Sequence, residues 1–133
     1  MKQYERLTKY IFDLKNDRNG DMVQAKKEGN TLIMPHVEFT ETVNAFTDEV
    51  YRFVEETSIF GRESYGEILE KNGLEWSFGS MQEAIMDQLD GQCIVALIIV
   101  AIRAERFCDG AFLRFLDNGS IVKWLERLQE LDK

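Results

Sequence analysis

The densest cluster of chemically reactive side chains in this sequence follows its longest apolar run. The apolar residues 93–102 lead directly into the string Arg-Ala-Glu-Arg-Phe-Cys-Asp-Gly at 103–110. Two guanidinium groups beside an aromatic side chain can clamp a carboxylate or a phosphate, because arginine presents a planar fork of donors. If the helix continues through this string, Arg103, Arg106 and Phe107 share one side of it. The candidate functional cluster is Arg103, Glu105, Arg106, Cys108 and Asp109.

The same cluster also has structural interpretations, which the sequence leaves open. Arginines near a helix C-terminus can satisfy the last carbonyls, complement the helix dipole and pair with carboxylates. On a helix, Glu105 and Asp109 share a side, so they can act as a general acid and base or simply neutralise a neighbouring arginine. A catalytic Cys108 would need a base, and the only histidine is His36. The alternative for Cys108 is a packed, unreactive thiol.

Metal and cofactor motifs are not found in the sequence. His36 has Glu38 and Glu41 as its local acidic neighbours, but Met34 to Val37 is equally typical of a strand that leads into a helix. The chain contains no Cys-x-x-Cys pair and no glycine-rich phosphate loop. We therefore expect no metal and no cofactor.

Length and composition predict one globular domain over residues 1–133. Hydrophobic residues make up 44% and charged residues 30% of the chain, a balance typical of a folded domain. The apolar run 93–102 is far shorter than the roughly 20 residues that cross a bilayer, so we expect no membrane association. The N-terminus shows no export pattern and the two cysteines show no disulfide spacing. These features predict a cytoplasmic protein.

The negative charge is concentrated in the middle of the chain. The formal net charge is −8, and residues 38–90 carry three Lys/Arg against thirteen Asp/Glu. A surface of this sign argues against direct nucleic-acid binding, which depends on cations that neutralise phosphates. It can serve solubility alone. It can also mimic nucleic acid and bind a basic protein through a stripe containing Glu41, Glu49, Glu55 and Glu56.

The periodicity predicts a mainly α fold around a buried central helix. Helices are expected over residues 2–15, 40–56, 64–72, 80–89, 90–108, 111–116 and 120–131. The expected N-caps include Thr40, Ser64, Ser80 and Asp90, and Gly110 is expected to end the central helix. A small β-hairpin is expected near residues 22–37, packed over one side of the helices because two strands alone are only marginally stable.

The C-terminal helix predicts self-association. Trp124 and four aliphatic residues form a clean apolar face on residues 120–131. Part of that face can extend beyond one small core and meet the same face of a second copy, since twofold dimers are the commonest oligomers. We therefore predict a homodimer through this helix.

Several of these residues also resemble the signature of a known family. The string Arg-x-Glu-Arg-Phe-Cys-Asp-Gly-Ala at 103–111, followed by Phe115, Gly119, Ile121 and the segment 124–128, is similar to a family of small bacterial proteins of unknown function. The segments 72–76 and 89–93 also resemble the family. The resemblance implies a bacterial, cytoplasmic, single-domain protein, and it supplies no activity or catalytic residue.

The sequence supports three hypotheses for function. The first is a non-enzymatic protein that acts through an interaction surface. The second is an enzyme or small-anion-binding protein with a pocket at Arg103–Asp109. The third is the acidic nucleic-acid mimic. A concave pocket at the candidate cluster would favour the second, and a convex acidic stripe would favour the third.

Overall fold

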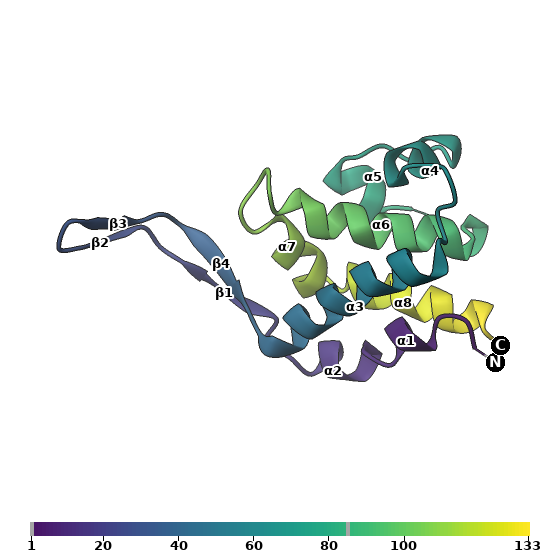
Figure 1. The fold of residues 1–133 in the computed structure, drawn as a ribbon, viewed down its shortest axis with the longest axis horizontal. Helices are drawn as coiled ribbons and strands as arrows, with labels where there is room; N and C mark the ends of the chain where they lie inside the picture. Colours follow the sequence, from purple (N-terminus) through teal and green to yellow (C-terminus); the bar gives the residue numbers. More distant parts are fainter. Residues whose placement is uncertain (1, 85) are drawn as a thin grey trace.

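The protein consists of a helical body and a long β-ribbon that leaves it at one end (Figure 1). This computed structural model describes residues 2–84 and 86–133. Helix covers 57% of the chain, and the strands form two small two-stranded antiparallel sheets. The predicted fold class, mainly α with a small hairpin, is therefore confirmed.

Helix α6 (Gly91–Ala104) is the centre of the body. Asp90 is its N-cap, as predicted, and the Asp90 carboxylate accepts a 2.9 Å hydrogen bond from the backbone N–H of Cys93. Every residue from Cys93 to Ile102 is at most 8% exposed. A helix that is apolar on all sides can be stable only where other elements surround it. The body supplies those elements.

Four of the described helices pack on α6. The predicted neighbours α3 (Glu41–Thr57) and α8 (Ser120–Leu131) both pack on it. Helices α4 (Tyr65–Lys71) and α7 (Ala111–Asp117) pack on it as well. The predicted N-caps Thr40 and Ser64 are confirmed, since their hydroxyl oxygens accept hydrogen bonds from Val43 N–H and Glu67 N–H. These caps fix where α3 and α4 begin. The contacts of α4 and α7 with α6 were not predicted.

The N-terminal segment is not the single helix predicted over residues 2–15. It forms two short helices, α1 (Glu5–Thr8) and α2 (Ile11–Lys15), separated at Lys9–Tyr10. Both pack on α3 and α8, and Leu7 and Leu14 are both buried. The bend lets the segment follow the surface of the body, which a straight helix could not do.

The segment before α6 also differs from the prediction of a helix over 80–89 capped by Ser80. Helix α5 (Phe78–Gln82) begins earlier, and Ser77 caps it by accepting a 3.3 Å hydrogen bond from Ser80 N–H. The 3₁₀ turn η1 (Met86–Gln88) follows. The reason is tertiary: the Phe78 ring packs on Phe115 with centroids 4.8 Å apart, which places Phe78 in the helix. The predicted helix also covers Ile85, which lies outside the described residues.

Helix α6 ends at Ala104 rather than at residue 108. Residues 105–107 form turns, and Gly110, at φ +91°, is the N-cap of α7 (Ala111–Asp117) rather than the stop of α6. The predicted arrangement of Arg103, Arg106 and Phe107 on one helix face is therefore wrong. The apolar pattern continues past Ala104, but the chain turns there to begin α7.

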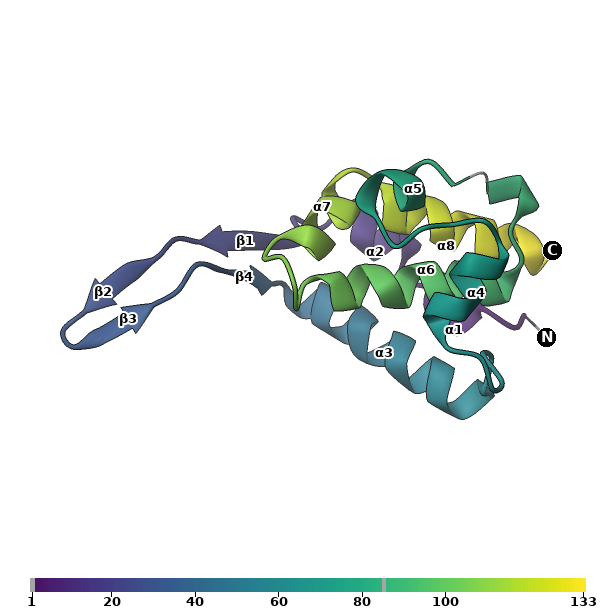
Figure 2. The ribbon, with the colours of Figure 1, turned by 90° about the horizontal axis from the view of Figure 1, so that it is seen from above.

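The hairpin spans residues 20–39 and does not cover the helices. Strand β1 (Gly20–Val23) pairs with β4 (His36–Phe39), and β2 (Lys26–Glu28) pairs with β3 (Thr31–Ile33) farther from the body. Figures 1 and 2 show from two directions that this ribbon, the arm, projects away from the body. All three β2 residues are exposed, so this strand offers no apolar face for helices to bury. The predicted packing over the helices is wrong.

Candidate functional site

Glu105 connects two helices. Its carboxylate accepts hydrogen bonds from the backbone N–H groups of Gly110, at 2.7 Å, and Phe112, at 3.0 Å. Glu105 is also the C-cap residue of α6, so it satisfies donors at the start of α7 from the end of α6. Both carboxylate oxygens have these structural partners, and the acid–base pair with Asp109 has no support in this geometry.

Arg103 supports a row of aromatic rings. Its guanidinium carbon lies 5.5 Å from the centroid of the Tyr65 ring, a distance typical of a cation–π contact. Tyr65 meets Trp76 edge-on with centroids 6.0 Å apart, and Trp76 meets Phe107 in the same way at 6.2 Å. The Arg103 Nε atom is buried, and no atom of residues 2–84 and 86–133 accepts a hydrogen bond from it. Arg103 therefore positions aromatic side chains rather than pairing with a buried carboxylate.

The remaining members of the predicted cluster are exposed. Arg106, Cys108 and Asp109 all lie at the surface, and within residues 2–84 and 86–133 no ion pair involves Arg106 or Asp109. The structure therefore brings the predicted residues to one turn without assembling them into one site.

Cys108 lies on the wall of an apolar hollow with a volume of about 240 Å³. Trp76 and Phe107, which are 51% and 79% exposed, stand at this hollow, and α5 and α7 form its walls. Arg114 also lines it, with its guanidinium 3.9 Å from the centroid of the Phe78 ring. Of the five predicted residues, only Cys108 lines the hollow, whose side chains are Trp76, Ser77, Phe78, Met81, Ala104, Phe107, Cys108, Ala111, Arg114 and Phe115. We call this feature the aromatic hollow.

The two cysteines differ in environment. Cys93 is fully buried in α6, and burial, reinforced by the Asp90 carboxylate, raises the pKa of its thiol to about 11. Cys108 is a free, exposed thiol. His36, the base considered for Cys108, has its ring nitrogens near its own strand instead, with Nδ1 2.9 Å from Met34 O and Nε2 3.6 Å from a Glu38 oxygen. These contacts give no support to a Cys108–His36 pair.

The acidic face of α3 is partly neutralised from within the chain. Arg6 Nε donates a 2.7 Å hydrogen bond to Glu49, and Arg6 Nη2 lies 2.5 Å from a Glu56 oxygen. The Glu49 side chain is only 12% exposed. Two of the four carboxylates proposed for nucleic-acid mimicry are therefore occupied by one arginine.

A polar clamp holds both strands of the arm at its root. Asn19, which precedes β1, accepts a 3.0 Å hydrogen bond from Thr40 N–H, which follows β4. The Asn19 amide nitrogen donates to Asp117 of α7 at 3.1 Å. Asp17 accepts from Asn19 N–H at 3.0 Å and from the Thr40 hydroxyl. The root is therefore fixed to the body by four side chains.

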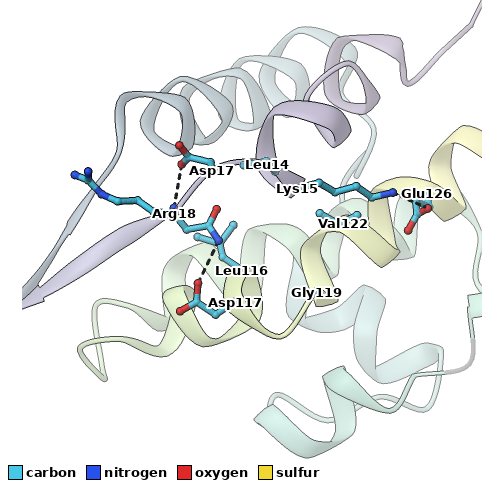
Figure 3. A pocket seen from close by; sticks show the side chains of 10 residues that line it. Leu14, Lys15, Asp17, Arg18, Leu116, Asp117, Gly119, Val122 and Glu126 are labelled. Atoms are coloured by element: carbon cyan, nitrogen blue, oxygen red, sulfur yellow. Dashed lines mark hydrogen bonds and ion pairs between the residues drawn. The ribbon is translucent and has the colours of Figure 1, made fainter.

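This clamp lies beside a hollow of about 590 Å³, which Asp17, Asn19 and Asp117 help to line (Figure 3). Figure 3 shows Lys15 of α2 and Glu126 of α8 pointing toward each other there, and their charged atoms are 3.6 Å apart. Dashed lines in the same figure mark the hydrogen bonds that Asp17, in the segment between α2 and β1, and Asp117 of α7 accept from Asn19. The charged and polar side chains at this hollow therefore pair with one another within the chain.

The outer part of the arm exposes large apolar side chains. Leu32 of β3 and Met34, which follows the end of this strand, are both 64% exposed. Lys27 is the cross-strand partner of Leu32. We call Leu32, Met34 and Lys27 the arm tip. This surface was not identified in the sequence analysis. The signal that could have found it is the apolar pair Leu32 and Met34 close to the charged run 26–28.

The apolar face of α8 is used inside the body. Ile121, Trp124, Leu125 and Leu128 are all fully buried, and only Leu131, at 38% exposure, lies outside. The face on which the predicted homodimer was based is therefore filled by the chain's own core. A dimer through this helix remains a prediction without a surface to carry it.

The comparisons place the chain in a family. It belongs to the family of unknown function DUF6508, whose model matches residues 1–133. Neither a curated protein nor a solved structure matches the chain. None of the described helices is long and apolar enough to cross a membrane, and the described residues contain no group of three or more His, Cys, Asp or Glu placed to hold a metal ion. The family assigns no activity to any residue.

Proposed function

We propose that this protein acts without catalysis, through an interaction surface, and that the arm is this surface. The observation that carries the proposal is the exposure of Leu32 and Met34 on a ribbon that projects from the body. A two-stranded ribbon in water is only marginally stable, and both of its edges carry unpaired backbone groups. Exposed apolar side chains on such an element are typical of a binding surface.

The anchoring of the arm supports the same proposal. Asn19, Thr40, Asp17 and Asp117 fix the root with side-chain and backbone hydrogen bonds. A rigid root reduces the conformational entropy that the arm loses when its tip binds. The clamp therefore suits a ribbon that presents the tip in a defined direction.

The geometry favours this proposal over the enzyme and the anion-binding protein. Glu105 is used to cap α7, and Arg103 stacks on Tyr65. The hollow beside Cys108 is mainly apolar, and the described contacts bring no base to its thiol. These groups form a scaffold around an apolar surface rather than a set of reacting groups.

The test is site-specific photocrosslinking in the cells from which the chain comes. A benzophenone amino acid replaces Leu32 in one variant and the exposed Glu55 of α3 in a matched control. We expect discrete ultraviolet-dependent protein adducts from position 32 and none from position 55. An equal adduct pattern from both positions, or none from position 32, would overturn the proposal.

A further inference from the structure

We propose that the partner of the arm is a second copy of this chain, whose aromatic hollow receives the arm tip. This inference rests on the proposed function and names its partner. The chain carries both halves of the contact: an apolar pair at the arm tip and an apolar hollow rimmed by Trp76 and Phe107. The hollow volume of about 240 Å³ suits one or two aliphatic side chains.

The arm cannot fill the hollow of its own chain. Its root lies beside the turn that forms the hollow, because the Phe39 ring packs on Phe112 with centroids 5.4 Å apart. A Cβ added to Gly110 would meet the end of Met22 of β1 at 3.0 Å. From this root the ribbon runs away from the body (Figures 1 and 2), so the tip lies far from its own hollow.

The positions of root and hollow fit twofold symmetry. In an antiparallel pair of arms, each tip lies at the root of the other arm. Since the aromatic hollow is at the root, each tip then reaches the partner's hollow. The contact is isologous: the same two surfaces meet twice, and the assembly closes at two copies.

The rim of the hollow carries charges of both signs. Arg114 lines the hollow with its guanidinium stacked on Phe78, and Arg106 is exposed beside Phe107, so a cationic arm can pair only with the carboxylates of this rim. Lys27 lies beside Leu32 on the arm. Glu75 and Asp109 are exposed and adjoin the hollow residues Trp76 and Cys108, and within the described ranges neither has an ion-pair partner. A tip that enters the hollow brings its ammonium group toward these carboxylates. The net charge of −8 makes a cationic tip the natural part of this chain to approach a second copy.

The exposed thiol of Cys108 provides the test. In a Leu32→Cys variant, a second copy seated as proposed brings the new thiol to Cys108, and a disulfide can form only if the two Cα atoms approach within about 7 Å. We expect oxidation with copper phenanthroline to give a disulfide-linked dimer, and peptide mapping should join the arm peptide to the Cys108 peptide. The yield should be several-fold higher than from Thr31→Cys, which points to the opposite face of β3.

Two controls keep the result decisive. Adding Cys108→Ser to Leu32→Cys must abolish the dimer, because a dimer that persists joins one arm to another and overturns the seating in the hollow. Equal yields from Leu32→Cys and Thr31→Cys would show random collision and also overturn it. The parent must sediment as a dimer at high micromolar concentration. If the parent is a monomer and its arm crosslinks a different protein in cells, the partner is not a second copy of this chain. The proposed function, binding through the arm, would then still hold.

Discussion

The carboxylate of Glu105 accepts a 2.7 Å hydrogen bond from the backbone N–H of Gly110, so the residue at the end of α6 also begins α7. We predict that Glu105→Ala destabilises the protein by about 1–2 kcal/mol, because it leaves two partly buried donors without an acceptor. Urea unfolding measures this loss. Asp109→Ala in the same turn is the control and should have almost no effect. Equal losses for both variants would contradict the capping role.

Gly91 gives the second prediction. A Cβ at this position would overlap the hydroxyl and ring of Tyr4, which is buried against the start of α6. We expect Gly91→Ala to lower the free energy of unfolding by about 1–3 kcal/mol through overpacking, although alanine is a better helix former than glycine. Gly66→Ala in α4, where the nearest described atom is 3.9 Å away, should be neutral or stabilising. A stabilising Gly91→Ala would show that Tyr4 is not held there.

The central helix and the arm should differ sharply in their response to truncation. Ile98 is fully buried in α6, and we expect Ile98→Ala to cost about 2–5 kcal/mol. Leu32→Ala on the arm should change stability by less than about 0.5 kcal/mol when measured on the monomer at low protein concentration. A similar loss at both positions would mean that the arm packs on the body.

Asn19 offers a test of the clamp at the arm root. Its φ of +71° lies in the left-handed region, and its amide binds Asp117. Asn19→Gly loses the amide contact but tolerates the backbone, whereas Asn19→Ala loses the contact and adds about 1–2 kcal/mol of backbone strain. Thermal unfolding should therefore rank the parent above Asn19→Gly and Asn19→Ala lowest. If Asn19→Gly and Asn19→Ala have the same melting temperature, the left-handed backbone conformation at this position costs alanine nothing.

The buried thiol predicts a dependence of stability on pH. The pKa of Cys93 is raised from 9.0 to about 11 in the folded protein, so between these values the unfolded chain binds fewer protons at this residue than the folded one. Stability should therefore fall as pH rises from about 9 to 11, and it should be unaffected by this group below that range. Urea unfolding at several pH values should show a shallower fall in Cys93→Ala than in the parent. Parallel curves would show that Cys93 does not carry the effect.

The sequence predicted those parts of the fold that depend on local interactions. Thr40, Ser64 and Asp90 are N-caps as expected, because a cap needs only a side-chain oxygen and the three residues that follow it. Ser77, and not Ser80, caps α5 because Phe78 must reach Phe115, a contact between segments far apart in the sequence. The predicted end of α6 at residue 108 was wrong for a similar reason. The Glu105 side chain caps α7 by accepting hydrogen bonds from Gly110 and Phe112, and α6 ends before it.

The candidate site depends more strongly on tertiary structure. The spacing of Arg103 and Arg106 suggested a clamp, but only the fold shows Tyr65 against Arg103 and leaves Arg106 at the surface. The residue pattern near 22–37 correctly predicted two paired strands. This pattern contains no information on what packs against the faces of the strands, so the projection of the arm could not be predicted.

Sedimentation equilibrium of a chain with a shortened arm tests the central claim most directly. Val23 and His36 are paired in the register of β1 and β4, so a two-residue Asn-Gly turn can join them in place of residues 24–35. The clamp and the body remain in this variant, and its melting temperature should match that of the parent monomer. We predict that the parent sediments as a dimer at high micromolar concentration and that the shortened chain sediments as a monomer. Equal masses for the two folded proteins would contradict the account.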